Sequence, residues 1–172
     1  VYWMATEDHD FEEINYFNFQ GKKLQWSPPK SPTGAVGRLN TKGLEEVCEA
    51  FSNQLGVSNR AEELKQLFRQ AYLEHETLTD ATRYLANKLF GSYGLVIVDG
   101  DDANLKRLLI PYAQKDIFDN LGYKKVSETI TGLNALAEKY TIQVNPREIN
   151  YFYLKDGVRE RIVYKNERFY VL

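Results

Sequence analysis

The chain has little cysteine, little histidine and no long hydrophobic run, and each scarcity excludes a class of protein. Its single cysteine, Cys48, excludes an internal disulfide framework and fits a reducing compartment. No apolar stretch approaches the roughly 18 residues of a membrane span, and no signal-peptide pattern opens the chain. We therefore expect a cytoplasmic protein that does not bind membranes.

Charge and metal ligands are also limited. The chain has 22 Lys and Arg against 24 Asp and Glu, a net charge of −2, which gives no electrostatic reason to expect nucleic-acid binding. Two histidines and one cysteine on separate elements match no zinc-ligand spacing, so no metal ligands are assigned. Gly-rich phosphate loops and a coiled-coil heptad run are missing as well.

Two apolar segments that run straight into ionisable residues are the most informative feature present. Residues 1–5 and 95–98 are predicted to be buried strands, and the second is apolar on every side chain, which favours parallel pairing. Strands of this kind deliver polar side chains to the ligand-binding edge of an open sheet. The candidate site residues at these two strand ends are Glu7, Asp8, His9 and Asp10, and Asp99, Gly100 and Asp101.

Periodicity outlines the remaining elements. A hairpin is predicted over 16–26, a proline-rich loop over 27–34, and helices over 44–55 (N-cap Thr41, C-cap Gly56), 59–72 (N-cap Asn59) and 77–91. A helix from 103 should kink or end at Pro111, and another spans 126–140. A strand over 141–144, a turn over 145–148 and an antiparallel meander over 151–172 with an Asp156–Gly157 turn complete the pattern.

Five motifs in this order resemble the bacillithiol-biosynthesis cysteine-adding enzymes, over essentially the whole chain. They are residues 2–15 (YWMATEDHDFEEIN), 37–39 (GRL), 83–86 (RYLA), 94–101 (GLVIVDGD) and 143–150 (QVNPREIN). The resemblance implies a ligase that joins cysteine to glucosaminyl-malate in the last step of bacillithiol synthesis, with a homodimer possible for the full-length protein. Upstream and downstream segments of the family are absent here, so we expect this portion alone to be inactive.

The expected fold is α/β: a single Rossmann-like domain over residues 1–172 with a mainly parallel sheet, helices on both faces and an antiparallel C-terminal extension. Val1 already lies inside a predicted strand, so we interpret the chain as a piece of a longer protein.

Amide formation requires an activated carboxylate, so ATP or another nucleotide, with Mg²⁺, is the expected cofactor. His9, oriented by Asp8 or Asp10, is expected to donate a proton or hydrogen bond to a phosphate, with its pKa raised by the carboxylates. The alternative role for Asp10 is to cap the following helix. Asp99 and Asp101 are expected to bind a magnesium-bridged phosphate, a ribose hydroxyl or the glucosamine amine, with Gly100 permitting close approach.

The turn that contains Asn145 supplies the last candidates. Arg147, stiffened by Pro146, is expected to bind a malate or cysteine carboxylate through its guanidinium group, and Glu148 is expected to hold Arg147 in place. The alternative to carboxylate binding is a structural ion pair between Arg147 and Glu148. For the acidic residues at the two strand ends, the alternative to ligand binding is capping of the helix that follows. At the level of function, the alternative is a nucleotide- or sugar-binding module of the same fold without catalysis. Cys48, on an apolar helical stripe, is expected to be buried and inert.

Overall fold

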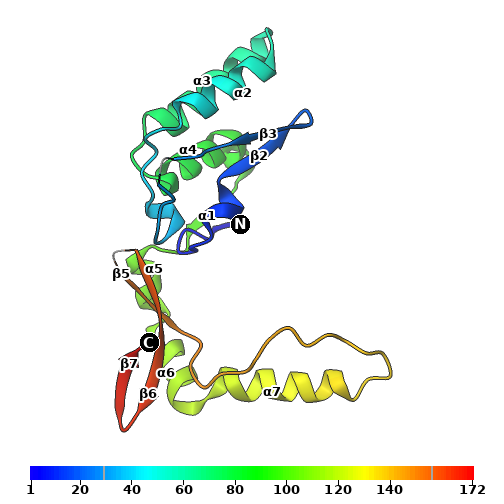
Figure 1. Ribbon diagram of the computed structural model, residues 1–172, viewed down its shortest axis with the longest axis vertical. Coiled ribbons are helices and arrows are strands. Elements are labelled where there is room, and N and C mark those ends of the chain that lie inside the picture. Colours follow the sequence, from blue (N-terminus) through cyan, green and yellow to red (C-terminus); the bar gives the residue numbers. More distant parts are fainter. Residues whose placement is uncertain (29, 156) are drawn as a thin grey trace. The chain divides into compact units, whose positions relative to one another are not determined.

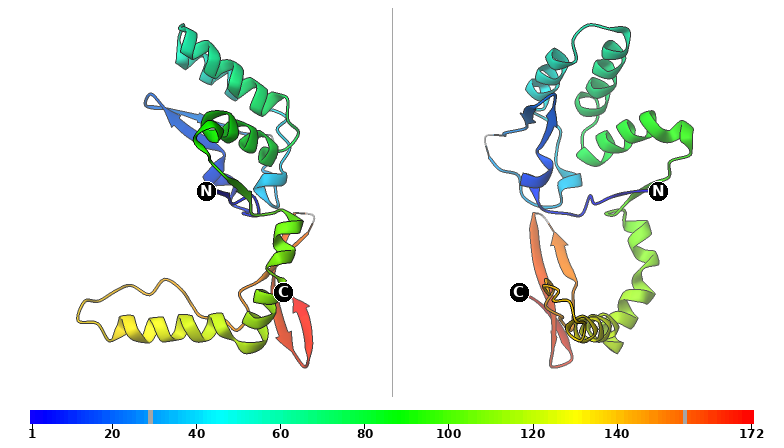
Figure 2. Two further views of the ribbon diagram at one scale, coloured as in Figure 1. Left: turned by 180° about the vertical axis from the view of Figure 1, so that it is seen from behind. Right: turned by 90° about the vertical axis from the view of Figure 1, so that its right-hand side faces the viewer.

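The computed structural model describes residues 1–28, 30–155 and 157–172. The chain divides into two compact units, Val1–Asp102 and Ala103–Leu172, which we call the first and the second unit. Figures 1 and 2 show the elements of each unit, coloured along the sequence. The prediction of one domain over the whole chain stays a prediction.

A parallel strand pair lies at the base of the first unit. Strand β1 (Tyr2–Met4) pairs with β4 (Ile97–Asp99), and the register places Met4 beside Asp99. This confirms the predicted parallel pairing of the two apolar segments. Because parallel strands end at the same edge, the residues that follow β1 and β4 leave the pair side by side.

The predicted hairpin is confirmed in the blue segment of Figure 1. Strands β2 (Tyr16–Phe19) and β3 (Lys22–Gln25) pair antiparallel. Gln20 and Gly21 connect them with φ values of 49° and 77°, the two positive angles that a type I′ turn requires. The short helix α1 (Phe11–Ile14) lies between β1 and this hairpin.

The three longest elements of the first unit are the helices α2 (Glu45–Leu55), α3 (Asn59–Leu73) and α4 (Leu78–Phe90). Short 3-10 turns, η1 (Val36–Arg38) and η2 (Gly91–Tyr93), flank them. In the core, Phe11 packs edge-on against Trp26 with ring centroids 5.3 Å apart, and Leu44 completes the cluster. The hairpin is attached to α2 and α3 through the rings of Phe17, Phe19, Phe51 and Phe68.

Of the three predicted helix caps, two are wrong and one, Gly56, is confirmed. Thr41 does not cap α2, because it lies too far before the helix and its hydroxyl donates to the His75 carbonyl. Ser58, not Asn59, caps α3 by accepting from the Ala61 N–H at 3.1 Å. Thr77 starts α4, and Gly56 ends α2 with a φ of 72°.

The described residues mix helices and strands as the predicted α/β class requires, but their sheets are not mainly parallel. Only β1 and β4 are parallel, and the other described strands form antiparallel pairs. Trp3 and Val96 are 56% and 58% exposed, so helices do not cover both sides of the strand pair. An all-apolar run such as Leu95–Val98 indicates a parallel strand but carries no information about how many strands join it.

The second unit begins with helices α5 (Ala103–Leu108), α6 (Ile110–Asp119) and α7 (Leu121–Asn134). Pro111 lies in the first turn of α6, where its missing N–H is tolerated, and the predicted break at this proline is confirmed. The helix predicted over 126–140 instead starts and ends earlier. Residues 141–144 are not a strand, because no partner strand satisfies their backbone groups.

The predicted C-terminal meander is confirmed. Strands β5 (Phe152–Lys155), β6 (Val158–Lys165) and β7 (Arg168–Val171) form one antiparallel sheet in the order β5-β6-β7. The predicted Asp156–Gly157 turn includes Asp156, which lies outside the described residues. Among the residues that the structure describes, no helix has the length and apolar character to cross a membrane.

Candidate functional site

The loop after β1 and the turn after β4 are joined by the buried side chain of Thr6. The Thr6 hydroxyl donates to Asp99 Oδ1 and accepts the backbone N–H of Asp101 at 3.0 Å. Asp99 Oδ1 accepts the same N–H at 3.0 Å, and Gly100 donates its N–H to the Met4 carbonyl at 3.0 Å. The two strand ends therefore form one hydrogen-bonded site, as the parallel pairing predicts.

Two arginines that the sequence analysis did not single out complete this site. Arg83 on α4 bonds Asp99 Oδ2 at 2.9 Å, and Arg38 on η1 holds Asp101 with two bonds, one of them 2.9 Å from Nη2 to Oδ1. The carboxylate side chains are only 15% and 10% exposed, whereas Arg83 and Arg38 remain 46% and 53% exposed. The aspartates therefore orient half-exposed guanidinium groups, the geometry that suits an anionic partner.

Close backbone packing holds the η1 turn against the loop after β1. Val36 and Gly37 donate their N–H groups to the carbonyls of Asp8 and Thr6, at 2.6 and 2.9 Å. A Cβ on Gly37 would overlap the side chains of Thr6 and Thr79, so only glycine fits there. This contact places Arg38 beside the strand ends. The Gly-Arg pair was visible in the sequence, but its partner Asp101 lies 63 residues away.

Glu7 and His9 lie at this edge with polar atoms that are buried and unpaired. Glu7 Oε2 and His9 Nδ1 are shielded from solvent and have no hydrogen-bond partner in the part of the chain that the structure describes. A Cβ on Gly100 would overlap the Glu7 carboxylate, so the glycine makes room for it. An unpaired buried polar group costs about 1–3 kcal/mol, a cost that a ligand able to bond it would remove.

Asp8 and Asp10 act differently from the expectation. Asp8 accepts the backbone N–H of His9 at 2.6 Å, so it fixes the chain and does not orient the imidazole. Asp10 occupies the N-cap position of α1, yet its side chain makes no capping hydrogen bond. The capping alternative for Asp10 is therefore wrong. Both side chains are exposed at the edge of the site.

Asn145, Arg147 and Glu148 belong to the second unit. All three are exposed and lie in a segment without helix or strand between α7 and β5. Within the described ranges Arg147 and Glu148 form no salt bridge, so the alternative of a structural ion pair between them is wrong. Their expected role in binding a carboxylate stays a prediction.

Cys48 and His75, the other two side chains of types that often act in catalysis, have structural contacts instead. Cys48 is 5% exposed, and burial raises the pKa of its thiol. His75 stacks on Tyr84 with ring centroids 4.8 Å apart, and its Nδ1 lies 2.9 Å from the Gln70 carbonyl. Among the described residues, no group of three or more His, Cys, Asp or Glu side chains is placed to hold a metal ion. A magnesium ion here would need oxygens from a bound phosphate.

Comparison with known proteins is consistent along the whole chain. Residues 1–172 match the family model described as bacillithiol biosynthesis BshC, N-terminal Rossmann-like domain. Proteins named "Putative cysteine ligase BshC" are 56% identical in Flavobacterium johnsoniae, 50% in Christiangramia forsetii and 41% in Cytophaga hutchinsonii, over 99%, 99% and 100% of this chain. The chain spans 31%, 32% and 30% of the length of these relatives. With its parallel strand pair and its strand-end site, the chain belongs to the BshC family and corresponds to the N-terminal Rossmann-like domain of that family.

Proposed function

We propose that the strand-end site of the first unit serves a ligase that joins cysteine to glucosaminyl-malate, the last step of bacillithiol synthesis. The observation that carries the proposal is the Glu7 carboxylate packed against Gly100 of the Asp99–Asp101 turn. Glu7 and His9, in the same loop after β1, each have a buried polar atom without a partner among the described residues. The names of the relatives support a ligase. The hydrogen bonds of Thr6 to Asp99 and Asp101 hold the two strand ends of the site together.

The chemistry assigns a role to each group at this edge. A carboxylate becomes a substrate for amide formation only after activation, for which we propose ATP and Mg²⁺. The amine would then attack the acyl carbon, the activating group would leave with the bonding electrons, and the proton of the amine would pass to the Glu7 carboxylate. Glu7 accepts a hydrogen bond from the amine, and His9 donates one to the leaving phosphate oxygens. Asp8, by bonding the His9 backbone, positions that residue.

Arg38 and Arg83 are the proposed groups for the negative charge of the substrates. Asp101 and Asp99 hold them so that little side-chain entropy is lost when an anion binds. The expected role of Asp99 and Asp101 changes accordingly: their buried carboxylates act through the arginines and do not meet the ligand directly.

The two histidines of the chain provide a matched test in the full-length protein. With cysteine, glucosaminyl-malate, ATP and Mg²⁺, we expect His9→Gln to lower kcat for bacillithiol formation by about 10²–10⁴-fold, the usual contribution of a positioned proton donor. His75→Gln makes the same chemical change at a residue that makes no hydrogen bond to the strand-end residues in the described part of the chain, and it should leave turnover near that of the unsubstituted protein. Mass spectrometry of the product gives the rate, and circular dichroism checks folding.

Turnover of His9→Gln equal to that of His75→Gln would remove the proposal. Binding of nucleotide or sugar with no product from the unsubstituted protein would favour a non-catalytic binding module.

The arginine role has its own test. Arg83→Met should raise KM for glucosaminyl-malate by about tenfold or more, the effect of losing about 1.4 kcal/mol of binding. Arg60→Met is the control, because Arg60 forms an exposed helical ion pair with Glu63 outside the site. Equal KM values for the two variants would show that Arg83 does not bind the substrate.

A further inference from the structure

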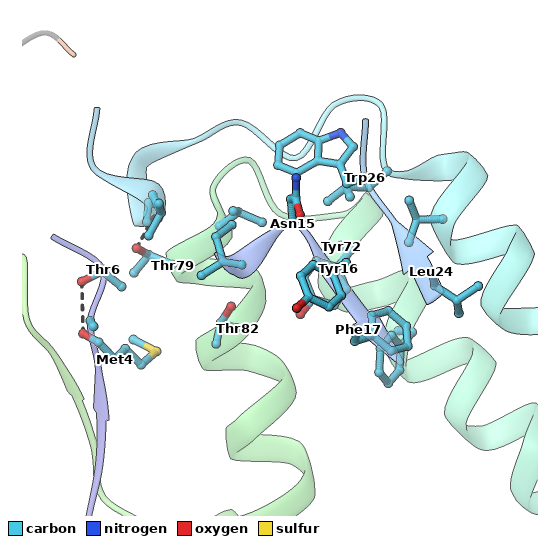
Figure 3. A pocket seen from close by; sticks show the side chains of 18 of the residues that line it. Met4, Thr6, Asn15, Tyr16, Phe17, Leu24, Trp26, Tyr72, Thr79 and Thr82 are labelled. Carbon is cyan, nitrogen blue, oxygen red and sulfur yellow. Dashed lines mark hydrogen bonds between the residues drawn. The ribbon is translucent and has the colours of Figure 1, made fainter. Parts of the chain in front are cut away.

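The first unit contains a pocket that the ligation chemistry described above does not use. Its volume is about 590 Å³, within the range of about 300–1,000 Å³ typical of small-molecule sites. It lies between β1, the β2–β3 hairpin and helices α2, α3 and α4. Figure 3 shows side chains from the hairpin, such as Tyr16 and Phe17, and from α4, such as Thr79 and Thr82, around it.

The wall of this pocket carries no charged side chain among its described lining residues. Its polar groups are hydroxyls, the Asn15 amide, the indoles of Trp3 and Trp26 and the Cys48 thiol, and the other lining side chains are apolar. An unpaired carboxylate or ammonium placed here would cost several kcal/mol, so neither glucosaminyl-malate nor zwitterionic cysteine fits. The occupant must be uncharged where it enters the pocket.

The wall also has the composition that recognises a flat ring with polar edges. The aromatic residues Phe17, Phe51 and Phe68 form a contiguous cluster, with centroids 4.3–6.4 Å apart. Asn15 is only 6% exposed, and Tyr72 and Thr82, which carry hydroxyl groups, also line the pocket. Aromatic and apolar walls accept the faces of a heteroaromatic ring, while a few amide and hydroxyl groups bond its edge.

Thr6 connects this pocket to the strand-end site. It lines the pocket, and its hydroxyl donates to Asp99 in the site described above. A ligand with its ring in the pocket would therefore extend its other part toward the end of β1, where Arg83 and Arg38 are held by Asp99 and Asp101. A nucleotide combines these two parts, an uncharged planar base and an anionic phosphate chain.

We propose that this pocket binds the base of a nucleotide and that the phosphates lie at the ends of β1 and β4. The inference rests on the nucleotide requirement of the proposed function, and it adds the place and the orientation of that nucleotide. It needs no covalent step.

The pocket carries its own reporters. Cys48, the single cysteine of the chain, lines it, and so do both tryptophans, Trp3 and Trp26. Thiol labelling in the full-length protein, read on the Cys48 peptide by mass spectrometry, follows occupancy without any turnover. Because burial raises the pKa of the Cys48 thiol, labelling is run at alkaline pH.

Adenosine, guanosine, cytidine and uridine are the probes, with inorganic triphosphate as the probe that lacks a base. At about ten times its dissociation constant, the preferred nucleoside should slow Cys48 labelling about tenfold, since only about a tenth of the pockets stay free. Triphosphate alone should not slow it. If none of the four nucleosides slows labelling, or if triphosphate alone does, the proposal is overturned.

A second readout covers the case in which Cys48 does not react even without ligand, as it would if another segment of the protein filled the pocket. Titration of the tryptophan fluorescence with the same nucleosides then decides: a saturable change supports the proposal, and its absence overturns it. Neither readout involves bacillithiol formation. The proposed nucleotide site can therefore be disproved while the proposed ligase activity is supported, and the ligase activity can be disproved while the nucleotide site is supported.

A filling variant tests the place of binding. Thr82→Trp puts an indole into the pocket and should abolish protection of Cys48 by the preferred nucleoside. Asn53→Trp adds similar bulk at an exposed position of α2 and should leave protection unchanged. Circular dichroism confirms that both variants fold. Undiminished protection in a folded Thr82→Trp protein contradicts the proposed place.

Discussion

Both units of the chain contain helices and strands, but the helices of the first unit bury side chains and those of the second do not. In the first unit helices α2, α3 and α4 each bury residues, and the rings of Phe11 and Trp26 meet in a core. In the second unit α5, α6 and α7 bury none, and the buried apolar residues within the described ranges are Ile149 and Val163. Helix stability in proteins comes mainly from packing of an apolar face, so we infer that the first unit is the stable scaffold of the site.

The largest expected effect on stability comes from removing a buried aromatic ring of the first unit, compared with an exposed ring of the second. Phe51 is 4% exposed and contacts three other rings, whereas Phe118 in α6 is 60% exposed. Phe51→Ala should lower the free energy of unfolding by about 3–5 kcal/mol, the cost of emptying a core position. Phe118→Ala should cost less than about 1 kcal/mol. Denaturant unfolding followed by tryptophan fluorescence reports the first unit, which holds both tryptophans. A loss below about 1 kcal/mol for Phe51→Ala would contradict the core assignment.

The next effect concerns the link between the strand ends. Thr6→Val keeps the shape of this buried side chain but removes its bonds to Asp99 and to the Asp101 N–H. We expect a loss of about 2 kcal/mol in the free energy of unfolding, the usual value for a hydrogen bond to a charged group. The variant should also lower kcat/KM, because Asp99 orients Arg83. Thr131→Val, at an exposed position of α7, is the control and should change neither quantity by more than about 0.5 kcal/mol.

The smallest effect compares two glycines with equally open surroundings. Neither Gly132 in α7 nor Gly56 after α2 has a neighbour that an added Cβ would meet. Gly132→Ala should stabilise α7 by about 0.5–1 kcal/mol, because alanine restricts the unfolded chain. Gly56 has a φ of 72°, so Gly56→Ala should destabilise the first unit by about 1 kcal/mol. Circular dichroism and tryptophan fluorescence measure the two effects, and equal signs would contradict the difference in backbone conformation.

Local patterns in the sequence predicted the elements better than their assembly. The apolar runs gave β1 and β4 and their parallel pairing, Pro111 gave the break before α6, and the alternating C-terminal segment gave its meander. The absence of a strand over 141–144 was not predictable, since a strand exists only with a partner. The prediction of a mainly parallel sheet failed for the same reason, because strand pairing is decided by residues distant in the sequence.

The site was predicted in outline, and its electrostatics were missed. The joining of the two strand ends, through Thr6 and the Asp99–Asp101 turn, followed from the parallel pairing. The pairing of Asp101 with Arg38 across 63 residues and of Asp99 with Arg83 across 16 leaves no local signal in the sequence. Thr6 was overlooked because a buried threonine after a strand resembles any other strand residue. Its importance rests on bonds to a turn 93 residues away.

Hydrogen exchange in the full-length protein, with and without glucosaminyl-malate, cysteine and a non-hydrolysable ATP analogue, tests the central claim most directly. If the ends of β1 and β4 form one ligand site, the amides of residues 6–10 and of residues 99–102 should slow together and over the same ligand concentrations. Slowing confined to one of the two segments, or to neither while the ligands bind, would contradict a shared site.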